Sequence, residues 1–376
     1  MKKPRICHVI SRFKGDYPLF DRAVAGLKEL GYSQCIIFLA GGLPEDAEIR
    51  QTGCKIHLLS PYRKRLRGLS PQVILRLRRI AKDFNAHILH AHRHKPTIYS
   101  ALAAVGTDVS VFSTVHALMK TRNIRRKLIN RLVMPRVATI IAVSEAVRRD
   151  VLMTNPSLKE EKVEVIYNGI DLKLFAPGKY SKDEARKAFG IGPVAGPVFG
   201  TAGRLVPVKG HDILLKAWAA SGLQELGGLL VFAGDGREAG RLKQLAADLK
   251  INGSVRFLGH VQKMDMFYAG IDCFVFPSRM EGHPLALIEA MASGVPLVTT
   301  TAGGIPEVLG PVGGTDAALV VEPNDMTALS EAIKAMVKLY ENSDRLEKVR
   351  GALLKRASHF SYESMIRCLD GLYSRI

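Results

Sequence analysis

The chain has 376 residues, of which 47% are hydrophobic, and a formal net charge of +19. Its apolar runs are of strand length, far short of the about 20 residues that a membrane-spanning helix needs, and no signal-peptide apolar region follows the charged N-terminus. The five cysteines are scattered and form no CxxC pair, which argues against a zinc or disulfide framework and favours reduced thiols in a cytoplasm.

Short apolar runs alternate with helical stretches through the first half of the chain. Strands are predicted at 5–10, 34–40, 55–60, 87–92, 109–116 and 138–144, with a helix over 20–31 after the first. Continuous apolar strands that alternate with helices are typical of a parallel sheet covered on both faces. Residues 168–180 hold two glycines and a proline without a clear period, and we expect the domain boundary in this segment.

The pattern restarts in the second half of the chain. Strands are predicted at 197–205, 228–236, 254–260, 273–278, 295–300 and 317–323. We therefore predict an α/β fold of two Rossmann-like, doubly wound parallel-sheet domains, residues 1–172 and 173–359. In such folds ligands bind outside the carboxyl ends of the strands, so we expect a central cleft between two facing crevices.

The stretch SRMEGHPLALIEAMASG, residues 278–294, joins a strand to a helix. Pro284 is expected at the first helical position and Gly294 just past the end, which places Glu281 in the preceding loop and Glu289 inside the helix. The start of a helix is a favourable binding site for a phosphate, because its free N–H groups and its positive dipole end attract anions. A carboxylate accepts hydrogen bonds from sugar hydroxyls, so the two acids are expected to hold hydroxyl-rich groups on either side of the phosphate.

This stretch resembles the E-x7-E motif of the family-4 retaining glycosyltransferases. Further matching segments follow the family's order: AVSEAV (142–147), VIYNGIDLKLF (165–175), GRLVPVKGHDILLKAW (203–218), FAGDG (232–236), VRFLGH (255–260) and TAGGIPEVL (301–309). The resemblance implies the two-domain GT-B fold, with a last helix at about 360–376 that packs back on the N-terminal domain. Lipopolysaccharide core glycosyltransferases are the members it resembles most.

The resemblance also implies roles for individual residues in the C-terminal half. Arg204 and Lys209 would neutralise the departing nucleotide diphosphate, and Glu281 would hold hydroxyls of the donor sugar. The ribose would lie on Glu289. The remaining donor-binding positions are Gly234, Leu258, His260 and the backbone of Leu285 and Ala286.

In the N-terminal half the resemblance implies a second set of residues. His116 would lie near the donor sugar. The family often has a Gly-Gly loop after the first strand, whereas this chain has only Gly15 there. Either Gly15 with Lys14 or Asp16 serves as that loop, or the acceptor side is built differently. No cofactor and no metal ion are expected, because the two cations would replace a divalent ion, and a UDP-sugar is the expected donor.

The positive charge is concentrated in residues 1–175, where 31 Lys and Arg face 14 Asp and Glu, a balance of +17. Basic clusters at 62–82 and 120–136 have the pattern of amphipathic helices, which favours an anionic membrane surface or a phosphorylated, lipid-linked acceptor such as the lipopolysaccharide core. We therefore expect a peripheral protein on the cytoplasmic face of the inner membrane. In the alternative, the apolar faces pack on the sheet and the cations are solvated.

Other interpretations stay open. A sugar-nucleotide epimerase of the same fold would need no large acceptor, and a basic nucleic-acid-binding protein would explain the charge, although no aromatic platform interleaves with the cations. His90, His92 and His94 alternate along a predicted strand and would share one face, but no cysteine or carboxylate joins them, so no metal site is predicted. The oligomeric state, the sugar and the acceptor hydroxyl are left undetermined.

Overall fold

The computed structural model describes residues 3–13, 18–60, 68–118 and 124–376, and it divides into two compact units. One unit comprises Met1–Gly169 with Tyr362–Ile376, and the other comprises Ile170–Ser361. The sequence-based boundaries at 172 and about 360 lie within a few residues of these divisions.

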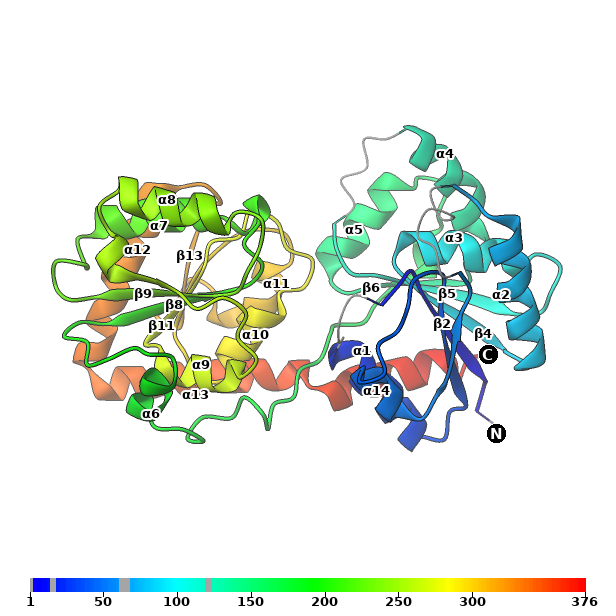
Figure 1. Ribbon diagram of the computed structural model, residues 1–376, viewed down its shortest axis with the longest axis horizontal. Coiled ribbons are helices and arrows are strands. Elements are labelled where there is room, and N and C mark those ends of the chain that lie inside the picture. The colour runs from blue at the N-terminus through cyan, green and yellow to red at the C-terminus, as the bar shows by residue number, and fades with distance from the viewer. Residues whose placement is uncertain (1–2, 14–17, 61–67, 119–123) are drawn as a thin grey trace. The chain divides into compact units, whose positions relative to one another are not determined.

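The first unit contains a seven-stranded parallel sheet (Figure 1). Its elements are β1 (Ile6–Ile10), α1 (Pro18–Glu29), β2 (Gln34–Phe38), β3 (Lys55–Leu58), α2 (Pro71–Asp83), β4 (Ile88–His92), α3 (His94–Ala103), β5 (Ser110–Val115), α4 (Ile124–Val133), β6 (Thr139–Ala142), α5 (Glu145–Thr154), β7 (Val163–Val165) and α14 (Tyr362–Tyr373). The strand order is β3-β2-β1-β4-β5-β6-β7, so the order reverses between β1 and β4. Sequence reasoning missed β7, a three-residue edge strand that pairs with β6.

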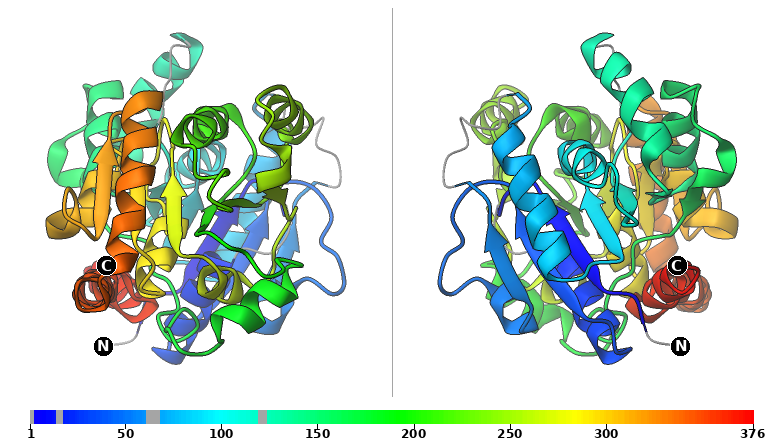
Figure 2. Two further views of the ribbon diagram at one scale, coloured as in Figure 1. Left: turned by 90° about the vertical axis from the view of Figure 1, so that its left-hand side faces the viewer. Right: turned by 90° about the vertical axis from the view of Figure 1, so that its right-hand side faces the viewer.

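Two apolar layers cover the faces of this first sheet. Side chains of α2, α3 and α5, including Leu77, Tyr99 and Val151, form one core. On the other face, Leu27 of α1 packs with Tyr373 and neighbouring residues of α14. The last helix of the chain therefore belongs to the core of the first unit, and the views along the long axis show helices on both sides of the strands (Figure 2).

The second unit contains a six-stranded parallel sheet in the order β10-β9-β8-β11-β12-β13. Its elements are α6 (Lys182–Ala188), β8 (Val198–Ala202), α7 (His211–Ser221), β9 (Leu229–Ala233), α8 (Ala239–Asp248), β10 (Val255–Phe257), α9 (Met264–Gly270), β11 (Cys273–Phe276), α10 (Leu285–Ala292), β12 (Leu297–Thr300), α11 (Ile305–Leu309), β13 (Ala318–Val321), α12 (Met326–Val337) and α13 (Ser343–Ala357). The strand order reverses between β8 and β11. The predicted class, two Rossmann-like parallel-sheet domains, is confirmed.

The inner strands of the second unit, β9, β8, β11 and β12, are buried on both faces, which explains their continuous apolar sequence. Phe199 of β8, Phe274 of β11 and Trp218 of α7 are fully buried. Within the described ranges, no helix combines the length and the apolar character that crossing a membrane requires.

Candidate functional site

The candidate site lies at the carboxyl edge of the second sheet, where β8 and β11 are neighbours and the strand order reverses. Open parallel sheets bind ligands at this kind of switch point, because the loops that leave the two strands diverge to opposite faces. The loop after β8 carries Arg204 and Lys209, and the loop after β11 carries Glu281. The topology therefore brings the two predicted cations and one predicted acid to the same edge of the sheet.

Lys209 and Glu281 form a largely buried ion pair. The Nζ atom of Lys209 lies 2.6 Å from Oε1 of Glu281, and the two side chains are only 17% and 10% exposed. The hydroxyl of Ser278 donates to the same oxygen at 2.6 Å. Within the described chain no hydrogen bond reaches Oε2, so this atom can accept from a ligand hydroxyl, and the ammonium group of Lys209 retains N–H donors for an anion.

A guanidinium clamp holds the two loops together. Arg279 donates to both carboxylate oxygens of Asp212, at 2.8 and 2.9 Å, and its backbone N–H donates to Val208 at 2.8 Å. Bidentate pairs of this kind fix orientation as well as contributing energy. The clamp therefore sets the position of Lys209 relative to the loop that carries Glu281.

Glycines allow the backbones of this edge to approach closely. Gly210 has φ of +70°, and a Cβ there would lie 2.0 Å from the carbonyl oxygen of Pro277. Gly303, with φ of +57°, faces the carbonyl oxygen of Glu281 in the same way, at 2.1 Å. Only glycine fits such positions, so the loop before α10 is held from both sides by the backbone.

Glu289 lies on α10 and has a different environment. Its Oε2 atom is 3.0 Å from the hydroxyl of Tyr268, which also lies 3.0 Å from the carbonyl oxygen of Ala286. Burial raises the pKa of Glu289 to about 7. Because the tyrosine has one proton and two acceptor neighbours, a protonated Glu289 can donate to the tyrosine while the tyrosine donates to Ala286.

The start of α10 differs slightly from the prediction. Pro284 is the residue before the helix, with φ of −80° and ψ of 95°, and Leu285 is the first helical residue, so the prediction of Pro284 at the first helical position is wrong by one. The N–H groups of Leu285 and Ala286 have no acceptor within the helix by their position. Gly294 has φ of +68° just past the helix end, as predicted.

The loops after β8, β9 and β10 are linked through their backbones. The N–H of Gly234 donates to the oxygen of Gly259 at 2.7 Å, and the N–H of Gly203 donates to Ala233 at 2.9 Å. Leu258 is partly buried and His260 is exposed, on the same linked loop. Arg204 is exposed, and no ion pair from the described residues reaches it.

Of the site residues predicted in the first unit, His116 lies in the described part of the chain. His116 follows β5 and stacks on His92 with ring centroids 6.1 Å apart, and burial lowers its pKa to about 4. Asp16 and Gly15 lie outside the described residues. The shared strand face predicted for three histidines is wrong for His94, because β4 ends at His92 and His94 begins α3, where it contacts Asn130 at 2.6 Å.

Two family models match the chain. The model described as "Glycosyltransferase Family 4" matches residues 20–174, and the one described as "Glycosyl transferases group 1" matches residues 182–349. The chain belongs to the family-4 glycosyltransferases.

Similar proteins fit this assignment. The chain is 34% identical over 219 residues to "Putative glycosyltransferase EpsF" of Bacillus subtilis. This alignment covers 56% of each chain. The chain is 30% identical over 219 residues to "Lipopolysaccharide core biosynthesis mannosyltransferase LpsB" of Rhizobium meliloti, covering 56% of this chain and 60% of that protein. The matches thus span little more than half the length of these relatives. The crystal structure of Anabaena HepE in complex with UDP and glucose has the same fold, with a TM-score of 0.83, 19% identity and coverage of 99% and 100%.

Sequence reasoning missed several residues that support the candidate site. Tyr268, Ser278 and the Arg279–Asp212 clamp all contact predicted site residues or their loops. Ser278 and Arg279 lie inside the quoted motif, close to Glu281 in the sequence, and this proximity could have identified them as residues that support Glu281. Nothing in the spacing of Tyr268 connects it with Glu289, because that contact depends on how α9 packs against α10.

Proposed function

We propose that this chain transfers a sugar from a nucleotide-sugar donor, with retention of anomeric configuration, to an anionic lipid-linked acceptor. The observation that carries the proposal is the largely buried Lys209–Glu281 pair at the switch point of the second sheet. A cation and a carboxylate held together there match a ligand with both phosphate and hydroxyl groups.

The donor diphosphate would lie against Arg204 and Lys209. When the bond between the sugar C1 and the diphosphate oxygen breaks, negative charge develops on the leaving phosphate, and fixed cations stabilise that charge. Lys209 is suited to this task because Glu281 and Ser278 fix its position before the donor binds. The N–H groups of Leu285 and Ala286, at the positive end of α10, would add donors for the phosphates.

Glu281 and Glu289 would hold the hydroxyl-rich parts of the donor. Oε2 of Glu281 would accept from sugar hydroxyls, and Glu289 would accept from the ribose. Because burial raises the pKa of Glu289 to about 7, ribose binding would be favoured when this carboxyl is ionised and accepts two hydrogen bonds. The UDP in the HepE structure supports a uridine nucleotide as the first donor to test.

The proposed transfer needs no protein nucleophile. The acceptor hydroxyl attacks C1 on the face that the leaving diphosphate vacates, the new C1–O bond forms, and the hydroxyl proton passes to the leaving phosphate oxygen. No protein carboxylate then takes part in bond formation, which agrees with Oε1 of Glu281 being engaged by Lys209 and Ser278.

The first unit would receive the acceptor at an anionic membrane surface. On α4, Leu128 and Leu132 are 59% and 67% exposed and are four positions apart, so they share one stripe of the helix, with Arg131 beside them. On α2, Leu75 is also exposed, but Arg76 and Arg78 donate to backbone carbonyls at 2.8 Å. Exposed leucines next to cations suit the boundary between lipid headgroups and acyl chains. The similarity to LpsB supports the lipopolysaccharide core as the acceptor.

The experiment that tests the proposal is a transfer assay with a panel of UDP-, GDP- and ADP-sugars and with lipopolysaccharide core acceptors of increasing length. We expect transfer from one donor class, retention of configuration by NMR, and loss of transfer in Glu281→Gln and Glu281→Ala. Glu225→Ala, an exposed acid in the same unit, serves as the control and should keep full activity. Full transfer by both Glu281 variants would refute the site, and isomerisation of the donor without acceptor would indicate an epimerase instead.

A further inference from the structure

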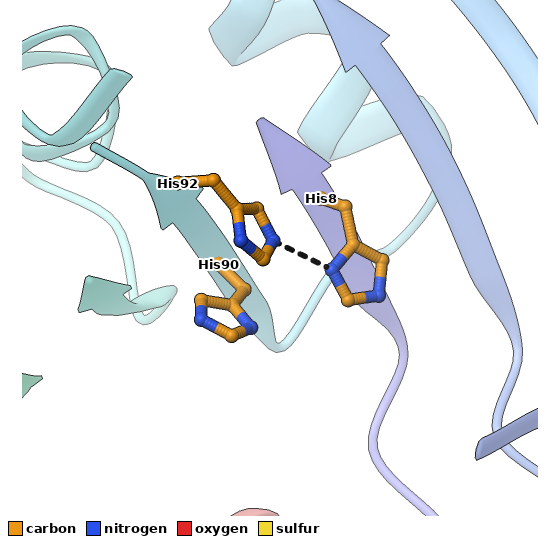
Figure 3. A group of neighbouring side chains, drawn as sticks. All are labelled: His8, His90 and His92. Carbon is orange, nitrogen blue, oxygen red and sulfur yellow. Dashed lines mark hydrogen bonds between the residues drawn. The ribbon is translucent and has the colours of Figure 1, made fainter. Parts of the chain in front are cut away.

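Three imidazoles lie side by side on the neighbouring strands β1 and β4, between which the strand order of the first sheet reverses (Figure 3). His8 and His90 are the middle residues of their strands, and His92 is the last residue of β4. His8 and His90 are register partners on these two strands, and His92 follows on the same face of β4. His8 and His90 are each 2% exposed, and His92 is partly buried. No residue of the proposed donor site belongs to this group.

Hydrogen bonds fix the tautomer of His8. The amide nitrogen of Gln34 donates to the backbone oxygen of Val24 at 2.9 Å, so the amide oxygen of Gln34 is the atom that faces His8. This oxygen lies 2.9 Å from Nε2 of His8, which must therefore carry the proton. The Nδ1 atom of His8 therefore carries no proton, and its lone pair points toward Nε2 of His92, from which it accepts a hydrogen bond.

The spacing between His8 and His92 is that of two ligands of one metal ion. Nδ1 of His8 and Nε2 of His92 are 3.3 Å apart. Two imidazole nitrogens at about 2.0–2.1 Å from a tetrahedral zinc ion are about 3.3–3.4 Å apart. One ion can therefore bind between the two nitrogens without a change in their separation, in place of the hydrogen bond that now joins them.

His90 completes a set of three ligands. One ligand atom from each of the three histidines can be chosen so that all lie within 4.8 Å of one another. The Nε2 atom of His90 lies 2.7 Å from the hydroxyl of Thr114, and its Nδ1 atom lies 2.5 Å from the hydroxyl of Tyr373. Binding a metal replaces one of these contacts, and the other then orients the ring, as outer partners of metal-bound histidines do.

We propose that His8, His90 and His92 bind one divalent first-row transition metal ion, with Zn²⁺ as the ion that fits best. Imidazole nitrogen suits Zn²⁺, Ni²⁺, Co²⁺ and Cu²⁺, whereas Mg²⁺ prefers oxygen. Burial keeps all three rings neutral at pH 7, because it lowers the pKa of each, and neutral rings are the form that binds metal.

Neighbouring groups affect the three-histidine site although they are not proposed as metal ligands. His116 stacks on His92 as a neutral ring, and the positive charge of Arg93 acts on His92 and His116. Three protein ligands leave a tetrahedral ion with one further position, for water or another oxygen. The nearby cation favours an anionic ligand, such as hydroxide, at that position.

The test uses the full-length chain without a histidine tag, stripped with a chelator and titrated with Zn²⁺ by calorimetry at pH 7.5. We expect about one ion per chain with a Kd of about 1 µM or tighter, and no competition from Mg²⁺. In a parallel titration, bound Co²⁺ should give the intense visible absorption of a tetrahedral site. His92→Gln should abolish binding. Gln34→Leu should weaken it by about 10–100-fold, because it removes only the group that orients His8.

The controls separate this site from general histidine binding and from misfolding. His57→Gln, a partly buried histidine of β3 in the same unit, should bind Zn²⁺ like the parent chain. The circular dichroism and melting temperature of metal-free His92→Gln should match the parent, since the side chain lies at a strand end. The proposal is overturned if the parent chain binds no Zn²⁺ at 100 µM, or if His92→Gln binds as tightly as the parent.

Discussion

Removal of the Lys209 charge should destabilise the second unit. Lys209→Met leaves the Glu281 carboxylate in a site where its side chain is only 10% exposed, with Ser278 as its remaining partner. Breaking a buried ion pair by deleting one partner costs about 3–5 kcal/mol. Because the Lys209 side chain is 17% exposed and the hydrogen bond from Ser278 persists, we expect a loss at or below the lower end of that range, about 2–3 kcal/mol.

Urea unfolding can isolate this effect to one unit. Trp218 is the single tryptophan of the chain and is fully buried in the second unit, so its fluorescence reports the unfolding of that unit. The double variant Lys209→Met/Glu281→Gln removes both charges and should recover at least half of the stability that Lys209→Met loses, since no uncompensated charge stays buried.

A double-mutant cycle decides the outcome. We expect the two substitutions to be strongly non-additive, as is found for residues in direct contact. Lys334→Met breaks a surface pair with Glu331, whose side chains are 42% and 66% exposed, and should cost less than about 1 kcal/mol. If the effects at 209 and 281 add within about 0.5 kcal/mol, the two residues do not form the pair described and the reasoning is refuted.

Three further predictions test other features. Gly303→Ala should destabilise the second unit by more than about 2 kcal/mol, because its Cβ would lie 2.1 Å from a backbone oxygen. The control Gly314→Ala, with φ of +76° and open space around its Cβ, should cost only about 1 kcal/mol. Equal losses of the two variants in urea unfolding would contradict this prediction. Burial raises the pKa of Glu289 to about 7, so the folded chain keeps a proton that the unfolded chain releases, and stability should fall as pH rises from about 5 to about 8. Glu289→Gln should flatten that fall, and unchanged slopes would argue against a buried carboxyl. Replacing Leu128 and Leu132 by serine should weaken flotation with vesicles that contain anionic lipid, and equal flotation of the variant and the parent would contradict the membrane-contact role proposed for these leucines.

The fold could be predicted from the sequence because its strands are continuous apolar runs. The predicted strand at 197–205 contains β8, and the one at 273–278 contains β11. The exception is β7, whose sequence VEV is short and contains an acid, since an edge strand buries less surface. Such a strand is specified by pairing with β6 rather than by its own composition.

The site could be predicted only in part, because spacing along the chain does not give contacts across a sheet. Glu281 and Lys209 were both singled out, but their direct contact depends on β8 and β11 being neighbours. His8 was not singled out for the same reason. A lone histidine on β1 carries no signal until the strand order places it beside His90. The error at His94 came from extending a strand period past the end of the strand.

The return of α14 to the first unit affects how that unit can be made. Met365, Leu369 and Leu372 cover an apolar face that includes Ile88 and Phe112, and Tyr32 donates to Asp370 at 2.7 Å. Residues 1–169 emerge from the ribosome long before residues 362–373 are translated. The nascent first unit therefore keeps an exposed hydrophobic surface while the whole second unit is synthesised. During that interval, chaperone binding or aggregation would compete with the docking of α14.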